Sequence, residues 1–171
     1  DYADAPFVQQ EFERIAAYGH PLTRITLGEL TPEQLTGALT GLDGVYVAGG
    51  NTFVLMDAMR RSGADLLLPD RVAVGLLYIG SSAGSIVAGP SLEPATLMDD
   101  VAAVPGFSDF RGLGLTDVVV VPHADGALPP YPRELIERTV AEFGDRFPLI
   151  TLADSEALLV DMDVRRKISS V

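Results

Sequence analysis

Two kinds of hydrophobic pattern alternate along this chain. Apolar residues recur at helical spacing in residues 6–18 and along one side of residues 132–143. Thr31, Pro32 and Glu33 have the order of a helix start, with a capping Thr, Pro at the first helical position and an acid in the first turn. The pattern therefore predicts helices over residues 6–18 and 132–143, from residue 31 to about 40, from residue 52 to about 61 and over residues 65–74, and a helix of small residues after residue 84.

The second pattern consists of short, continuous apolar runs that end near glycine or proline, which is typical of strands. The four consecutive valines at residues 118–121 are typical of a strand covered on both faces. Residues 90–116 are weakly patterned and are expected to form loops and short irregular pieces. Further strands are predicted over residues 22–27, 45–48, 76–79, 149–152 and 157–160, with the last two paired as a hairpin at one edge.

Strands that alternate with helices predict an α/β fold with a mainly parallel sheet flanked by helices. A length of 171 residues, without an internal repeat or an obvious linker, fits a single domain over residues 1–171. The composition agrees with a sizeable core, because 47% of the residues are hydrophobic and only 21% are charged.

Charge and residue usage argue against several classes of function. A formal net charge of -12 repels phosphate backbones and anionic lipid, so we expect no nucleic-acid partner and no membrane partner. No apolar run approaches the ~20 residues that span a bilayer, and the start at Asp1 is unlike the basic start of a signal peptide. The absence of cysteine removes disulfides, thiol nucleophiles and thiolate zinc sites, and it fits a cytoplasmic protein. With only His20 and His123, a histidine-rich metal site is not expected.

A candidate nucleophile directly follows the predicted strand at residues 76–79. This is where an open parallel sheet places its reactive groups, beyond the carboxyl ends of its strands. Residues 80–84 read Gly-Ser-Ser-Ala-Gly, a G-x-S-x-G sequence between a buried strand and a helix of small residues. This context is typical of a nucleophile elbow, a sharp turn that lifts its central serine, here Ser82, above the sheet. The alternatives are a turn without a role and a phosphate-binding loop, but no Lys or Arg lies between Arg71 and Arg111 to favour the loop.

A serine nucleophile needs a base. His123 follows the valine strand and is expected at the same rim, whereas His20 lies in a Gly-His-Pro turn that is typical of a surface. His123 is therefore the predicted base, with a structural histidine as the alternative.

A carboxylate should orient this histidine and stabilise its charged form. Asp154 ends the strand at residues 149–152 and is the first candidate. Glu156, two residues later, and Asp99 or Asp100, in the stretch after the elbow, remain open. The chain order of serine, histidine and acid differs from the order in α/β-hydrolases and disfavours that superfamily.

Acyl transfer also needs N–H donors for the developing oxyanion. The first candidate is the backbone N–H of Ala83, directly after the serine. Gly50 ends the neighbouring strand and is the second, because a residue without a side chain permits close backbone approach. Asn51 and Thr52 are predicted to cap the following helix and to contact the substrate; a plain capping turn is the alternative.

Four segments in this order resemble peptidase family S51, the group of peptidase E (aspartyl dipeptidase) and cyanophycinase. They are Gly49-Gly50-Asn51-Thr52-Phe53, residues 77–84, Pro122-His123 and Leu152-Ala153-Asp154, within about residues 45–160. The resemblance implies a fold like that of class I glutamine amidotransferases, with flavodoxin-like layering and a serine in place of their cysteine. It also implies Ser82 as nucleophile, His123 as base, and Gly50 and Ala83 as oxyanion donors.

The sequence departs from the family in three places. In peptidase E the acid is a Glu in the motif that matches residues 152–154, so Asp154 is a shorter substitute; an Asp soon after the elbow has also been assigned this role, which keeps Asp99 and Asp100 open. Peptidase E usually has a bulky residue where Ser81 stands. The family begins with a strand and loop ahead of the helix that starts here near Asp4, so the chain is expected to lack the family's first strand.

The resemblance implies a serine peptidase for short peptides that needs no metal or organic cofactor, and we expect a monomer or homodimer. We expect an aspartyl dipeptidase, which removes N-terminal Asp from small peptides; a cyanophycinase-like or other amide hydrolase and a non-catalytic small-molecule sensor are the alternatives. Arg133 stands where peptidase E carries an arginine for the substrate aspartate, and a solvated residue at a helix start is its alternative.

Overall fold

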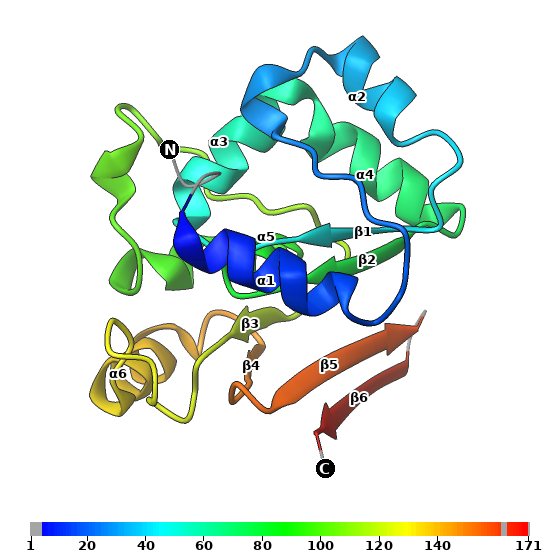
Figure 1. Ribbon diagram of the computed structural model, residues 1–171. Coiled ribbons are helices and arrows are strands. Elements are labelled where there is room, and N and C mark those ends of the chain that lie inside the picture. The colour runs from blue at the N-terminus through cyan, green and yellow to red at the C-terminus, as the bar shows by residue number, and fades with distance from the viewer. Residues whose placement is uncertain (1–4, 162–163, 171) are drawn as a thin grey trace.

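The computed structural model describes residues 5–161 and 164–170, and helices alternate with short strands through most of them (Figure 1). The predicted helix start near Asp4 lies outside the described residues. The helices are α1 (Pro6–Ala16), α2 (Pro32–Ala38), α3 (Thr52–Ser62), α4 (Ala64–Ala73), α5 (Ala83–Val87) and α6 (Arg133–Phe143), with the 3-10 helices η2 (Leu27–Glu29), η3 (Glu93–Leu97) and η4 (Val101–Ala103). The strands are β1 (Gly44–Val47), β2 (Leu77–Gly80), β3 (Val119–Val121), β4 (Leu149–Thr151), β5 (Glu156–Asp161) and β6 (Val164–Ser169).

The strands form three pairs, and two of these are parallel. β1 pairs with β2 and ends with Val47 opposite Gly80, while β3 pairs with β4 and ends with Val121 opposite Thr151. Each parallel pair therefore delivers its two carboxyl ends, and the loops that follow them, to one edge. β5 and β6 form an antiparallel pair. The chain has the expected mixed α/β fold with parallel strands, and the single domain over residues 1–171 stays a prediction.

The predicted strand at residues 22–27 is wrong. These residues run without strand pairing into η2. Their apolar side chains, Ile25 and Leu27, pack against the buried cluster that includes Phe53 and Met56 of α3. The apolar residues of this run therefore pack against a helix instead of forming a strand. The hydrophobic pattern alone does not distinguish these two cases.

The predicted hairpin of residues 149–152 with 157–160 is also wrong. β4 pairs in parallel with β3, and the N–H of Leu152 donates to the carbonyl of Val121 at 3.0 Å, which continues that pairing past the strand end. β5 pairs instead with β6, whose residues are all exposed and which contains Arg165, Arg166 and Lys167. A strand so polar lacks the apolar signal from which the other strands were predicted.

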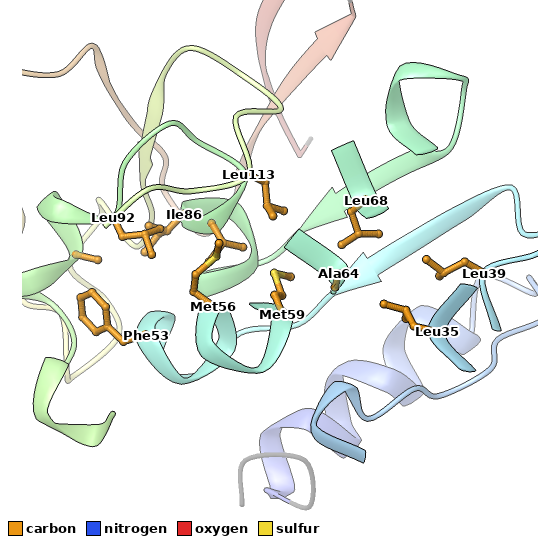
Figure 2. Packing of buried hydrophobic residues seen from close by; sticks show 12 residues of the cluster. Leu35, Leu39, Phe53, Met56, Met59, Ala64, Leu68, Ile86, Leu92 and Leu113 are labelled. Carbon is orange, nitrogen blue, oxygen red and sulfur yellow. The ribbon is translucent and has the colours of Figure 1, made fainter. Parts of the chain in front are cut away.

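The main core lies between the β1–β2 pair and the helices that cover one of its faces (Figure 2). Val45, Val47 and Tyr78 of the strands pack against this cluster. The buried members of the cluster are Leu35, Leu39, Phe53, Met56, Met59, Ala64, Leu68, Ile86, Val87, Leu92, Ala95 and Leu113. Residues 90–116 form η3, η4 and loops, as predicted, and their Phe107 and Phe110 pack edge-to-face on Phe53.

α1 lies beside the β1–β2 pair in Figure 1 and has no buried residue of its own. Its Glu11 accepts a 2.5 Å hydrogen bond from the hydroxyl of Tyr46, which alternates along β1 with the core-facing Val45 and Val47. Burial, with this bond to a carboxylate, raises the pKa of Tyr46. Among the helices within residues 5–161 and 164–170, none is long and apolar enough to cross a membrane.

Candidate active site

The turn that holds Ser82 is built from backbone contacts that only glycine permits. Ser82 lies between β2 and α5 with φ 50° and ψ −117°, a conformation that is rare for a residue with a side chain. A Cβ atom on Gly80 would lie 2.3 Å from the carbonyl oxygen of Gly84, and one on Gly84 would lie 2.1 Å from the carbonyl oxygen of Val47. The two glycines thus let strand and helix approach closely enough to hold the serine in its strained turn.

The glycine pair after β1 lies against this turn. A Cβ atom on Gly49 would lie 3.0 Å from Cβ and 3.4 Å from Oγ of Ser82, so the backbone of Gly49 contacts the serine. Gly50 follows with φ 141°, which favours glycine. The N–H of Ala83, at the first position of α5, has no partner within the helix. Both predicted oxyanion donors therefore lie next to the nucleophile. Ala83 directly follows Ser82, and Gly50 follows Gly49, whose backbone contacts the serine.

His123 lies directly after β3 and meets Ser82. Its Nε2 is 2.9 Å from Oγ of Ser82, and only 14% of its side chain is exposed. Its φ is 59°, again in the left-handed region, and its carbonyl accepts a 2.9 Å hydrogen bond from the N–H of Gly126, which closes a turn. The histidine therefore sits in a constrained turn of its own, 41 residues beyond the serine.

Asp154 meets the other side of the imidazole. Its Oδ1 lies 2.7 Å from Nδ1 of His123, and 49% of its side chain is exposed. The loops after β3 and β4 are joined by a hydrogen bond from the N–H of Ala124 to the carbonyl of Leu152 at 2.9 Å. An ionised carboxylate only accepts, so the hydrogen-bond network assigns the proton to Nδ1 and leaves Nε2 to accept from the hydroxyl of Ser82.

Glu156 is engaged elsewhere. Its carboxylate lies 2.7 Å from Nζ of Lys167 on β6 and accepts a 2.9 Å hydrogen bond from the N–H of Ala153. The bond to Lys167 and that backbone N–H hold the pKa of Glu156 below its usual value. Of the carboxylates that the sequence left open, Asp154 is the one that contacts His123.

Asp99 and Asp100 support the start of α3 and η4. Asp99 Oδ2 accepts from the N–H of Thr52 at 2.8 Å and from its hydroxyl at 2.6 Å. Asp100 accepts from the N–H of Ala102 at 2.9 Å and so caps η4. In the described part of the chain, neither carboxylate is hydrogen-bonded to His123.

Asn51 and Thr52 form the cap of α3. Asn51 Oδ1 accepts from the N–H groups of Phe53 and Val54, and its Nδ2 donates to the carbonyl of Asp100 at 3.0 Å. Thr52 is fully buried. These contacts favour the capping role, which the sequence left as the alternative to substrate contact.

Tyr131 is a further residue of this site that the sequence interpretation missed. Its ring stacks on the imidazole of His123, with centroids 5.0 Å apart and planes 5° from parallel, and its hydroxyl donates to Asp99 Oδ1 at 3.1 Å. Tyr131 lies in a Pro-Pro-Tyr-Pro stretch, where no periodicity or motif assigns a direction to its side chain. An aromatic residue in a loop close after the candidate base was the one available signal.

Arg133, the predicted cation for the substrate, and Arg111 differ in their surroundings. Arg133 begins α6, donates to the carbonyl of Asp125 at 3.2 Å and is exposed beside an open groove that Ala124 and Ile136 also line. The Arg111 guanidinium is held by Asp109 at 2.7 Å, and its hydrogen bonds keep the pKa of Asp109 well below the usual range. Of the two, Arg111 is ion-paired with a carboxylate, whereas the bond of Arg133 is to a backbone carbonyl. Arg133 is also the nearer in sequence to His123.

The site offers a hydroxyl, an imidazole and a carboxylate in one hydrogen-bonded array at the ends of β2, β3 and β4. Such an array can pass a proton from the hydroxyl to Nε2 while the carboxylate stabilises the charged imidazole. Within residues 5–161 and 164–170, no cluster of three or more His, Cys, Asp or Glu side chains could hold a metal ion.

Comparison with known proteins places this array in a family context. The sequence profile of peptidase family S51 matches residues 2–168. An uncharacterised peptidase of Listeria monocytogenes is 31% identical over 135 residues, which are 79% of this chain and 62% of that relative. Peptidase E of Streptomyces coelicolor is 34% identical over 128 residues, which are 71% of this chain and 50% of that relative. The chain thus spans less than two thirds of either relative's length.

A solved structure shares the fold. The crystal structure of a candidate peptidase E from Listeria monocytogenes EGD-e superposes with a TM-score of 0.88 at 24% identity, over 98% of this chain and 79% of that one. At this identity the likeness shows the fold alone.

Proposed function

The chain belongs to peptidase family S51, and we propose that it is a serine peptidase that cleaves short peptides, with Ser82 as nucleophile, His123 as base and Asp154 as the orienting acid. One observation carries the proposal: Ser82, His123 and Asp154 form a continuous array, with 2.9 Å and 2.7 Å between successive partners. The three side chains come from separate strand ends, which is the arrangement that open parallel sheets use for catalysis.

The proposed reaction begins with attack of Ser82 Oγ on the scissile carbonyl carbon. His123 Nε2 takes the hydroxyl proton and then gives it to the leaving amine, so that an acyl-enzyme forms. Water repeats the sequence on the acyl group and releases the acid product. Throughout, Asp154 keeps the proton on Nδ1 and stabilises the imidazolium that forms transiently.

Two backbone N–H groups are the proposed donors to the oxyanion. Ala83 adjoins the nucleophile, and Gly50 follows the glycine whose backbone contacts Ser82. Donors fixed in a backbone need no reorganisation as the negative charge develops. The glycine-only geometry of this region supports a role beyond an ordinary turn.

For specificity we propose a preference for N-terminal Asp, the activity that the resemblance to the aspartyl dipeptidases implies. A protein of charge -12 needs a local cation to hold an anionic side chain. Arg133 is the proposed cation, because its guanidinium is exposed and bonded to the loop that follows His123. We also propose that the helices and strands are layered as in class I glutamine amidotransferases. The two parallel strand pairs and their flanking helices support this arrangement.

Labelling with a serine-directed phosphonate tests the nucleophile independently of the substrate. Wild-type protein should be labelled, and Ser82→Ala and His123→Ala should each lower the labelling rate by several orders of magnitude. Ser81→Ala and His20→Ala are matched controls that should behave as wild type. Absence of labelling in folded wild-type protein would favour the non-catalytic sensor and overturn the proposal.

A dipeptide panel, with and without N-terminal Asp, then tests specificity. Arg133→Met should lower kcat/KM for Asp-Xaa peptides at least ~30-fold, since truncating one partner of a bonded charge pair costs ~2–5 kcal/mol. Cleavage of Asn-Xaa by the same preparation should barely change. Equal losses on both would assign Arg133 to the helix start, and cleavage of β-linked Asp-Arg but not Asp-Xaa would select a cyanophycinase-like activity.

A further inference from the structure

Tyr131 contacts two segments of the candidate site, the loop that holds His123 and the segment that holds Asp99. It lies in the loop between β3 and α6, and its ring lies parallel to the imidazole of His123 at a centroid distance of 5.0 Å. At its far end, its hydroxyl donates to Asp99 Oδ1 at 3.1 Å. One side chain thus contacts the histidine with its face and a distant segment of the chain with its tip.

Asp99, which anchors the tyrosine, is itself fixed. Its second oxygen accepts two hydrogen bonds from Thr52, a fully buried residue that begins α3. Its own N–H donates to the carbonyl of Ala95 at 2.8 Å. The hydroxyl of Tyr131 therefore ends on a carboxylate whose position is set by the core-packed helix α3.

The imidazole of His123 needs such a support. The residue has a positive φ, and its two ring nitrogens must face Ser82 and Asp154 at the same time. Asp154, on one side of the ring, is half exposed and lies in a turn. Rotation of the imidazole about its bond to Cβ would break both hydrogen bonds, and a parallel aromatic ring against its face opposes this rotation.

We propose that Tyr131 is a positioning residue, which holds the imidazole of His123 in the plane where Nε2 meets the serine and Nδ1 meets the acid. The inference rests on the proposed serine mechanism and extends it to a residue outside the array. The ring provides the stacking contact, and the bond to Asp99 fixes the ring against the imidazole.

Proton NMR can measure the stack without any substrate, because the chain has only two histidines. The ring current of Tyr131 should shift the imidazole protons of His123 upfield. Tyr131→Leu should remove this upfield shift, whereas Tyr131→Phe, which keeps the ring, should retain most of it. The signals of His20, which is exposed, serve as the internal control and should not move.

Phosphonate labelling and steady-state kinetics measure the consequence for the reaction. Tyr131→Leu should lower the labelling rate and kcat at least ~10-fold, since small misplacements of a catalytic group cost up to ~100-fold, with KM little changed. Tyr131→Phe should stay within about threefold of wild type. This rescue by the conservative variant separates positioning from support of the fold, which circular dichroism checks in each variant; Tyr131→Met replaces Tyr131→Leu if the latter does not fold.

The outcomes separate this inference from the proposed function. Labelled wild-type protein whose Tyr131→Leu variant reacts at the same rate would overturn the positioning role and leave the serine mechanism intact. The same holds if the imidazole signals of His123 are identical in both proteins. Folded wild-type protein that the phosphonate does not label would overturn the proposed function and, with it, this role.

Discussion

The turn that holds Ser82 and the two loops that hold His123 and Asp154 are built in different ways. The serine turn is packed by backbone, since a Cβ atom on Gly84 would come within 2.1 Å of the carbonyl oxygen of Val47. The loops of the histidine and the acid share a backbone hydrogen bond, but the two side chains are held by side-chain contacts, and Asp154 is half exposed. Both regions contain a strained residue, with φ 50° at Ser82 and φ 59° at His123. The nucleophile is therefore fixed by close backbone packing, whereas its partners depend on side-chain contacts between separate loops.

The largest expected loss of activity comes from a change in the loops that hold His123 and Asp154. Asp154→Asn should fold normally but lower kcat by about 10⁴, because Asn donates to Nδ1 and favours the wrong histidine tautomer. The measurement is single-turnover acylation by an activated ester, or phosphonylation by the phosphonate, with unfolding curves recorded for the same preparations.

Asp99→Asn is the matched comparison for that variant. Its oxygen can still accept from Thr52 while its amide donates to the hydroxyl of Tyr131, so a loss below about tenfold is expected. If Asp99→Asn proved severe and Asp154→Asn mild, the acid would be reassigned to the loop after the elbow.

The difference between the two regions explains what the sequence could and could not predict. The elbow was predicted because its requirements are local: a strand, two glycines, a central serine and a helix of small residues lie within about ten positions. His123 was predicted from scarcity and from its place after a buried strand. Asp154 could be ranked above Glu156 and Asp99, but their sequence positions left all three open.

The remaining features depend on pairings that one sequence does not specify. The direction of Glu156 depends on β6, a polar strand that was not predicted, and on its Lys167. The place of Tyr131 depends on the course of an irregular loop with several prolines. For residues 22–27, an apolar run was predicted as a strand but packs on α3, because burial against a helix and pairing in a sheet leave the same hydrophobic pattern.

A smaller effect is expected in the turn that holds Ser82. Gly84→Ala should lower the free energy of unfolding by about 1–3 kcal/mol, because the added methyl group meets the carbonyl of Val47 and forces the backbone to move. The Ser82 turn should shift with it, so the phosphonate labelling rate should fall as well. Urea unfolding followed by circular dichroism measures the stability change.

Gly37→Ala is its matched control. Gly37 also lies in a helix, α2, but a Cβ atom there would have no heavy atom within 4 Å. Relief of the helix-propensity penalty should stabilise this variant by about 0.5–1 kcal/mol. The two substitutions should therefore act in opposite directions, and equal effects would show that close packing does not distinguish the elbow.

The smallest expected effect is at Glu156, which begins β5 two residues after Asp154 but contacts Lys167 instead of the histidine. Glu156→Gln should leave kcat unchanged, because no proton relay passes through this side chain, and should lower the melting temperature only slightly. The pKa of Glu156 is held below its usual value of 4.5 in the folded protein by Lys167 and the N–H of Ala153. Folding therefore favours the ionised form, and this contribution is present above pH 4.5 and is lost as the pH falls through the folded-state value.

Wild type should be slightly more stable than Glu156→Gln at pH 6–7, and the difference should shrink as the pH falls below about 4.5. Lys167→Gln removes the same ion pair from the other strand and should reproduce the pH dependence, again with unchanged kcat. Melting curves across this pH range, together with phosphonate labelling at pH 7, measure both properties. A large loss of labelling in Glu156→Gln alone would mean that this carboxylate supports His123 directly. Asp154 and Glu156 would then act together, rather than Asp154 in catalysis and Glu156 in the β5–β6 pair.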